Sequence, residues 1–486
     1  MIKMHLKDQS LFRQQCYING EWVDADDGGT LDVTNPSSGA VIGTVPKLGA
    51  AETARAIDAA ETAFQSWRKQ TAKQRAVCLK RLAELMLENE EDLAKLMTIE
   101  QGKPLVESRG EVAYAASFFE WFAEEGKRVY GDVIPHHLPD RRIVVIKEPI
   151  GVCAAVTPWN FPSAMITRKA GPALATGCTI VIKPASSTPY SALALCELAE
   201  RAGIPAGVLN VVTGSSGQIG GELTSNSKVR KLSFTGSTQI GKVLMRQCAD
   251  TVKKVSMELG GNAPFIVFDD ADIDAAITGA IQSKYRNAGQ TCVCANRIFA
   301  HEDIYDEFAE KLAAAVREMK VGDGLEEGTE VGPLIDVAAV EKVEAHINDA
   351  VSKGAEVAVG GGRHERGGTF FQPTVIRHVK VNMDVSNAET FGPLAPLFKF
   401  SDEDEIIEMA NATEFGLAAY LYSRDIGRVW RMSEALEYGI VGINTGIIST
   451  EVAPFGGMKE SGFGREGSKY GIEDYVEVKY LCVAGI

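Results

Sequence analysis

Two cysteines separated by one residue stand in the polar stretch "NAGQTCVCAN", residues 287–296. A disulfide between Cys292 and Cys294 would require the loop to distort, so it would be strained and readily reduced. Zinc sites usually space their cysteines about two to four residues apart and add a second ligand pair, which the sequence does not show. The third interpretation is that one thiol is a nucleophile, which needs a base, an oxyanion donor and an electrophile.

Two further stretches offer a base and an oxyanion donor. In "TPWNFP" (157–162), two prolines fix a turn after an apolar run and hold Asn160, whose side-chain amide can donate to an oxyanion. An Asn between prolines is otherwise an ordinary turn residue. In "MELGGNAP" (257–264), Glu258 lies in a mostly apolar setting that raises a carboxyl pKa and suits a general base, whereas a lone Glu is usually just solvated.

A third stretch, "SFTGSTQIGK" (233–242), joins an expected strand to an expected helix through small residues. Backbone N–H groups and a helix N-terminus at such a junction bind a pyrophosphate. The stretch is not GxGxxG, so by itself it is weak evidence for a dinucleotide.

The elements that must position these groups are short apolar runs separated by helical segments, as in βαβ units on a buried parallel sheet. Because ligands of such sheets bind at the carboxyl ends of the strands, two series of runs predict two α/β domains with a cleft between them. The first series is "GVCAAVTP", "CTIVIKP", "VLNVV" and "KLSFTG"; the second is "APFIVF", "CANRIFA", a helix over 304–319, "VAVGGG", "APLFKF" and "GIVGIN".

Two other patterns complete the organisation. Residues 50–99 have a helical period, with Thr71 and Gln74 placed as a capping box. Residues 141–149 and 475–483 alternate like exposed strands. Since unpaired strand edges are a liability, we expect these two segments to be covered by each other or by another subunit.

The composition restricts the function classes. Acidic residues outnumber basic ones by 65 to 50 in 486 residues, which argues against a nucleic-acid partner and requires local cations for any anionic ligand. Nine scattered cysteines fit a reducing compartment. The sequence shows neither a signal peptide nor an apolar run long enough for a membrane span, so we expect a soluble cytoplasmic protein without a membrane partner.

Taken together, the motifs resemble one family, the aldehyde dehydrogenases, and appear in the family's order as "PWNFP", "KPA", "FTGS", "ELGG", "GQTC" and "ETFGP". The resemblance implies an α/β fold of aldehyde dehydrogenase type with three parts. These are a Rossmann-like cofactor domain (1–128 and 148–258), an α/β catalytic domain (259–460), and a small β oligomerisation domain (129–147 and 461–486). It also implies a homo-oligomer, either a dimer or a tetramer.

The resemblance assigns roles to individual residues. Cys292 matches the nucleophile, Glu258 the general base and Asn160 the oxyanion donor, while Lys183 and Glu389 match residues that hold the cofactor riboses. Further cofactor contacts are implied for Trp159, Ser186, Gly236, Ser237 and Leu259. No metal is implied. A thiol esterase would use the same cysteine, donor and base without a cofactor, and a non-catalytic protein on this fold would need none of the three.

Within the family, "NAGQTCVCAN", "INTGIISTEVAPFGG" (443–457) and the tail 461–475 resemble members that oxidise succinate semialdehyde. That likeness implies that Arg168, Arg286 and Ser449 bind the substrate carboxylate, in accord with the need for local cations in an acidic protein. Glutarate semialdehyde is the alternative substrate, because one methylene is worth only roughly 1–3 kcal/mol.

The cofactor prediction depends on the residue after "KPA". Members that prefer NAD commonly carry a Glu there, whereas this chain has Ser186, which does not repel a 2′-phosphate. We therefore expect NADP, with NAD as a second cofactor. For Cys294 two interpretations remain open: a small residue packed behind the nucleophile, or a redox partner that joins Cys292 under oxidation.

Overall fold

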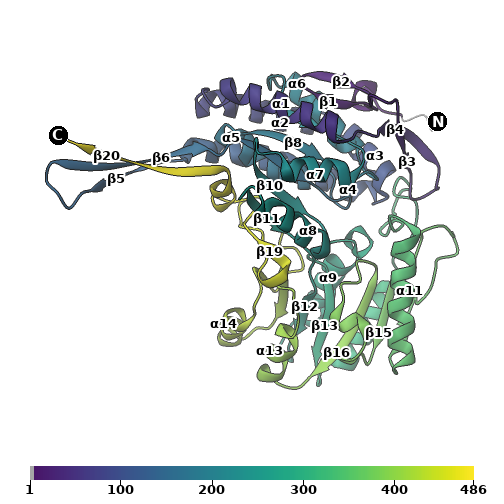
Figure 1. Ribbon diagram of the computed structural model, residues 1–486. Helices are drawn as coiled ribbons and strands as arrows, with labels where there is room; N and C mark the ends of the chain where they lie inside the picture. Colours follow the sequence, from purple (N-terminus) through teal and green to yellow (C-terminus); the bar gives the residue numbers. More distant parts are fainter. Residues whose placement is uncertain (1–4) are drawn as a thin grey trace.

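The computed structural model describes residues 5–486, which form two α/β bodies and a projecting arm (Figure 1). The first body is built on an eight-stranded sheet of order β19-β11-β10-β7-β8-β9-β1-β2. Its five inner strands, from β11 to β9, are parallel, and the outer ones pair antiparallel. The strands are β1 (Cys16–Ile18), β2 (Glu21–Val23), β7 (Val152–Val156), β8 (Thr179–Lys183), β9 (Leu209–Val211), β10 (Val229–Thr235), β11 (Lys254–Glu258) and β19 (Gly462–Phe463).

The parallel strands of the first sheet confirm the predicted βαβ pattern. All five residues of β8 are buried, which explains its continuous apolar run, since helices cover both faces of a parallel sheet. The connecting helices are α5 (Ala164–Thr176), α6 (Tyr190–Arg201), α7 (Ser216–Ser225) and α8 (Thr238–Ala249). The carboxyl ends of β7, β10 and β11 therefore meet at one edge, and each leads directly into one of the quoted motifs.

The helical pattern over 50–99 corresponds to three helices. The first break lies before Thr71, whose hydroxyl accepts from Gln74 N at 3.3 Å while Gln74 Oε1 accepts from Thr71 N at 2.8 Å. The predicted capping box is thus confirmed. These helices and their neighbour are α1 (Ala50–Trp67), α2 (Ala72–Glu88), α3 (Glu90–Gln101) and α4 (Leu105–Glu125). Within the described residues, no helix combines the length and apolarity needed to cross a membrane.

The second body contains a seven-stranded sheet of order β14-β15-β16-β13-β12-β17-β18, parallel except for the β14–β15 pair. The predicted second series of strands is confirmed. Its strands are β12 (Ala263–Val267), β13 (Ala295–His301), β14 (Glu356–Val359), β15 (Thr374–Arg377), β16 (Leu394–Phe400), β17 (Ala418–Tyr422) and β18 (Ile440–Ile443). Its main helices are α9 (Ile273–Lys284), α10 (Tyr305–Arg317), α11 (Val337–Ser352), α13 (Glu403–Asn411) and α14 (Ile426–Ala435).

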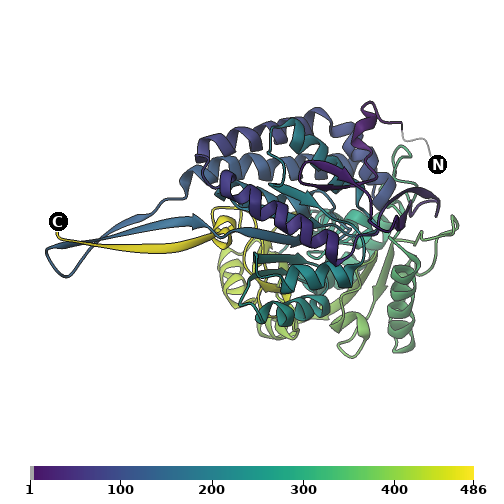
Figure 2. The same cartoon turned by 45° about the horizontal axis from the view of Figure 1, so that its top comes forward.

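The two alternating segments pair with each other, as expected for one of the two alternatives. β20 (Val476–Ala484) runs antiparallel to β6 (Arg141–Pro149), which also pairs with β5 (Asp132–Pro135). Both views show this three-stranded arm extending away from the two bodies (Figures 1 and 2). Every residue of β20 after Val476 is exposed. β19, which precedes β20 in the chain, pairs with β11 of the first sheet. The domain limits given in the sequence analysis stay a prediction.

Candidate active site

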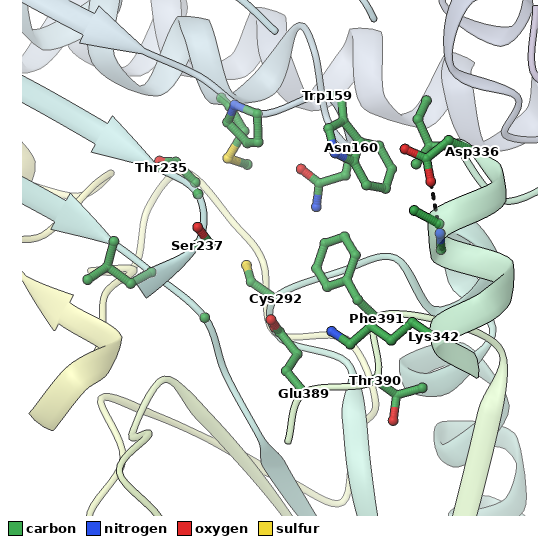
Figure 3. Close-up of a pocket in the computed structure, with 18 residues that line it drawn as sticks. Trp159, Asn160, Thr235, Ser237, Cys292, Asp336, Lys342, Glu389, Thr390 and Phe391 are labelled. Carbon is green, nitrogen blue, oxygen red and sulfur yellow. Dashed lines mark hydrogen bonds between the residues drawn. The ribbon is translucent and has the colours of Figure 1, made fainter. Parts of the chain in front are cut away.

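A cavity of about 380 Å³ lies where the carboxyl ends of the first sheet meet the second body (Figure 3). Seven residues singled out from the sequence line it together: Trp159, Asn160, Gly236, Ser237, Leu259, Cys292 and Glu389. The remaining lining comes from Pro158, Met165, Thr235, Gly260, Ile335, Asp336, Ala338, Ala339, Lys342, Thr390 and Phe391. The volume falls within the range of small-molecule sites in proteins.

Cys292 occupies the turn before β13, and its thiol faces the cavity (Figure 3). The chain reaches it through Asn287, Ala288 and Gly289, whose φ angles of 51°, 54° and 75° are all left-handed. Burial raises the pKa of the Cys292 thiol to about 12; the positive charge of Arg168 opposes this rise, and nearby carboxylates add to it.

Asn160 follows β7 and directs its amide toward Cys292 (Figure 3). Its Nδ2 donates to the carbonyl oxygen of Gln290 at 2.9 Å, which uses one of two N–H groups. Its Oδ1 is buried and has no hydrogen-bond partner in the part of the chain that the structure describes. The second N–H of Asn160 is therefore available to an oxyanion formed next to Cys292.

Glu258 is the last residue of β11, and both of its buried carboxylate oxygens lack a hydrogen-bond partner among residues 5–486. Burial raises the pKa of Glu258 well above its usual range, and the charge of Glu466 raises it further, against the opposing charges of Arg168 and Lys169. A carboxyl group with such a pKa is protonated at low pH and becomes a base as the pH rises.

Arg168, a predicted ligand of the substrate carboxylate, is paired with a carboxylate of the protein itself. Its Nε lies 2.8 Å from a carboxylate oxygen of Glu466, and its guanidinium stacks over Phe455 at 3.9 Å. Glu466 also binds Lys169, which donates to Thr235 Oγ1 at 2.6 Å. Neither Glu466 nor Lys169 was identified from the sequence, because no local pattern marks a charge that tertiary contacts bury.

The other predicted carboxylate ligands lie outside the cavity of Figure 3. Arg286 has its guanidinium 5.4 Å from the Phe161 ring, and its buried Nε has no hydrogen-bond partner in the described chain. The charges of Arg168 and Arg286 both act on the buried hydroxyl of Tyr114, which also lacks a partner within residues 5–486. Ser449 is half-buried in the loop after β18. Tyr114 was missed by the sequence analysis.

The cofactor candidates that line the cavity form a site with apolar walls and a helix start. Ser237 caps α8, and a Cβ atom on Gly236 would come within 2.5 Å of the Phe234 ring. Trp159 meets Phe391 edge to face at 5.6 Å between ring centroids. These features fit a dinucleotide, because a helix start binds phosphate and apolar walls hold planar rings.

Glu389 and three other polar residues surround this region. Glu389 Oε1 accepts from Gly261 N at 3.1 Å, and burial raises the pKa of its carboxyl to about 7. Lys183 ends β8 and donates to the Pro184 carbonyl at 3.2 Å, with its pKa lowered to about 8 by burial. Lys342 of α11 lines the cavity, whereas Lys183 does not. Ser186 is half-buried just beyond β8.

Cys294 lies buried behind the loop, and its thiol donates to the carbonyl oxygen of Lys284 at 3.5 Å. Cys292 and Cys294 are both free thiols in the structure. The geometry agrees with the small-residue interpretation, and the redox pairing stays a prediction.

The two α/β bodies meet at a cavity that a thiol faces, an arrangement that defines a two-domain α/β protein with a candidate nucleophile at the junction. The model of the aldehyde dehydrogenase family matches residues 22–481, so the chain belongs to this family, whose members use NAD or NADP. It is 70% identical over 481 residues to a glutarate-semialdehyde dehydrogenase of Pseudomonas putida, covering 99% of this chain and 100% of that protein.

A further relative and a solved structure each match this chain at 67% identity over nearly its whole length. The chain is 67% identical over 480 residues to an NADP(+)-type succinate-semialdehyde dehydrogenase of Escherichia coli strain K12, covering 99% and 100% of the two chains. A crystal structure of an NADP-dependent enzyme from Escherichia coli superposes with a TM-score of 0.98 at 67% identity, again covering 99% and 100%. The predicted family and fold class are therefore confirmed.

We expect Cys292→Ala to abolish dehydrogenase turnover and Cys294→Ala to retain most of it, because only the first thiol faces the cavity. The rate of reduced-cofactor formation, followed by absorbance, measures both. Thermal melting of each variant serves as the control for folding. Equal losses in the two variants would overturn the assignment of Cys292 as nucleophile.

We expect kcat of the wild type to rise with pH as Glu258 loses its proton, because its raised pKa keeps the carboxyl neutral at lower pH. Since Glu258 is the predicted general base, Glu258→Gln should give a single burst of reduced cofactor and no rising limb. Rapid-mixing absorbance over a pH series measures both effects. Full steady-state activity in the variant would show that another group is the base.

Proposed function

We propose that the protein oxidises succinate semialdehyde to succinate with NADP, with glutarate semialdehyde as the alternative substrate and NAD as a second cofactor. The observation that carries this proposal is the cavity in which the Cys292 thiol faces the Asn160 amide beside the start of α8.

The proposed chemistry uses three side chains in sequence. The Cys292 sulfur, as thiolate, attacks the aldehyde carbon, and the Asn160 amide with the Cys292 backbone N–H stabilises the resulting oxyanion. A bound nicotinamide would supply the acceptor for the hydride that the adduct loses as it becomes a thioester. Glu258 then takes a proton from the water that attacks the thioester, and the carboxylic acid leaves as Cys292 is restored.

The carboxylate end of the substrate is assigned to polar groups outside the cofactor cavity. Arg168 Nη2, Arg286 Nε and the Tyr114 hydroxyl are all buried, and none has a hydrogen-bond partner in the described residues. Buried donors without a partner are costly, and the carboxylate of a bound substrate would give them charge-assisted hydrogen bonds. We include Tyr114 with Arg286, Arg168 and Ser449 as the carboxylate ligands. Relatives named for the four-carbon and the five-carbon semialdehyde support both substrates.

The NADP assignment is supported by Ser186, which leaves the position after "KPA" uncharged, and by the NADP(+)-type relative. Lys342 adds a cation at the cavity for the cofactor's phosphates. An acidic chain with a net charge of -15 needs such a local cation to bind an anionic ligand.

We further propose a homo-oligomer, a dimer or a tetramer, in which the arm contacts another subunit. Val133, Val478 and Tyr480 of the arm are 73%, 68% and 67% exposed, so the arm presents apolar surface on an unpaired edge. The nine free cysteines support a reducing, cytoplasmic location.

The decisive experiment measures initial rates with NADP and NAD over a panel of aldehydes: succinate semialdehyde, glutarate semialdehyde and uncharged butanal. The proposal expects the highest kcat/KM for a semialdehyde with NADP. A preference for butanal, or cofactor-independent ester hydrolysis as the main activity, would refute it.

We expect Arg286→Ala to raise KM for succinate semialdehyde about 10–100-fold, because charge-assisted hydrogen bonds contribute roughly 1.5–3 kcal/mol. Butanal has no carboxylate, so its kinetics should change little. Arg366→Ala, which removes a surface arginine paired with Glu326, is the matched control. Comparable losses on both aldehydes would mean that Arg286 supports the loop and not the substrate.

We expect Ser186→Glu to shift the preference from NADP toward NAD by about one to two orders of magnitude in kcat/KM. A carboxylate about 4–5 Å from a 2′-phosphate charge repels it by roughly 3–4 kcal/mol at an effective dielectric of 20, and screening reduces this. Ser186→Gln, of the same size without the charge, is the control. An unchanged NADP/NAD ratio in the Glu variant would place Ser186 away from the 2′ position.

A further inference from the structure

Lys103 is a buried lysine that the proposed chemistry does not use. It lies in the short loop between α3 and α4, and its side chain is 0% exposed. A charged side chain is rarely buried in this way unless it is paired, so its contacts indicate what it holds.

The ammonium of Lys103 binds two oxygens. It donates to Glu111 Oε2 at 2.6 Å and to the main-chain carbonyl oxygen of Asn160 at 2.7 Å. It also lies 4.0 Å from the centre of the Phe161 ring. Lys103 therefore contacts the loop that carries the predicted oxyanion donor from outside the cavity, since neither Lys103 nor Glu111 lines it.

Glu111 extends this contact along the same loop. Its Oε1 accepts from the backbone N–H groups of Ser163, at 2.9 Å, and Ala164, at 3.2 Å. The ion pair thus holds the loop at both ends: the ammonium at the carbonyl of Asn160, and the carboxylate at the first turn of α5. Because the carboxylate is an acceptor at a helix start, the helix dipole favours this arrangement.

The nucleophile loop is joined to the same point. Asn287 Nδ2 donates to the Asn160 carbonyl at 3.0 Å, and Asn287 Oδ1 accepts from Gln101 Nε2 at 3.0 Å. Gln101 Oε1 in turn accepts from the backbone N–H of Lys103 at 2.9 Å. The loop between α3 and α4 therefore contacts both the oxyanion donor and the residues leading to Cys292.

We propose that Lys103, with Glu111 as its counterion, is a positioning residue that orients the side-chain amide of Asn160 through the main-chain carbonyl. This inference rests on the function proposed above, in which Asn160 stabilises the oxyanion. A donor accelerates such a reaction only if it is held in place before the charge develops. Two donors on the Asn160 carbonyl fix the peptide from which the amide projects.

If Lys103 only stabilised the fold, its loss would lower kcat independently of Asn160. A double-mutant cycle with Asn160 separates this structural role from the positioning role. Lys103→Met keeps the length of the side chain and removes the ammonium. We expect it to lower kcat about 10–100-fold, somewhat less than the loss of an oxyanion donor itself, while KM for aldehyde and cofactor changes less than about threefold. Cofactor-independent hydrolysis of an activated ester should fall by a similar factor, because it forms the same oxyanion.

The cycle adds Asn160→Ala. If Lys103 acts through Asn160, then Lys103→Met in the Asn160→Ala background lowers kcat by less than about threefold, because the group it orients is already gone. Losses that multiply in the double variant would overturn the proposal. An Asn160→Ala variant with wild-type kcat would instead overturn the proposed function of Asn160, so the two failures are distinguishable.

Two further variants show whether a loss of activity comes from a folding defect. Lys103→Met/Glu111→Gln removes both charges, so no uncompensated carboxylate stays buried, and it replaces the single variant in the cycle if the latter does not fold. Lys253→Met is the matched control, because Lys253 is a buried lysine that donates to the carbonyls of Asn226 and Val229, outside the site. We expect its kcat to stay within about twofold of wild type. A loss in Lys103→Met no larger than in this control would also overturn the proposal.

Discussion

The main-chain carbonyl of Asn160, in the loop after β7, is bonded to two other segments: the loop between α3 and α4 and the loop before β13. It accepts from Lys103 of the loop after α3 and from Asn287 of the loop before β13. The side chain of Asn160 is a donor in its turn, since its Nδ2 donates to the carbonyl oxygen of Gln290. One residue of the first body is therefore bonded through both its main chain and its side chain to the loop that carries Cys292. These hydrogen bonds connect the segment that carries the amide to the segment that carries the thiol.

The cysteine loop depends on these bonds because its backbone is strained. Three consecutive left-handed residues precede Gln290, and for a non-glycine residue such as Ala288 that conformation costs about 1–2 kcal/mol. At Gly289 a Cβ atom would lie 2.2 Å from the Gly392 carbonyl oxygen, so glycine is required there. Asn287 is held on three sides, by Gln101, Glu107 and Asn160. Such surroundings keep a strained turn in one conformation.

The sequence predicted the parts of the site that local patterns determine. Apolar runs and small residues placed Asn160, Glu258 and Gly236 at the carboxyl ends of β7, β11 and β10, because a strand and the motif that follows it are continuous in the chain. It did not reveal Lys103, Glu466 or Lys342. Tertiary folding brings each of them to the interior or to the cavity, and a lysine or glutamate destined for such a place has no local mark that separates it from a surface charge. The same reason explains why Arg168 was assigned to substrate without its partner Glu466.

Burial links this network to the chemistry. The largest cause of the pKa shift at Cys292, Glu258 and Glu389 is the loss of water around each group, which raises all three. The same exclusion of water strengthens every charge that stays, so Arg168 acts on both Cys292 and Glu258 although it is paired with Glu466. In such a site a small displacement of a donor changes the stabilisation of an oxyanion more than it would in water. In the proposed function Asn160 stabilises the oxyanion, so its amide must already face the thiol when charge develops. The pairing of Lys103 with Glu111 fixes the loop that carries this amide, which agrees with the cost of burying both charges.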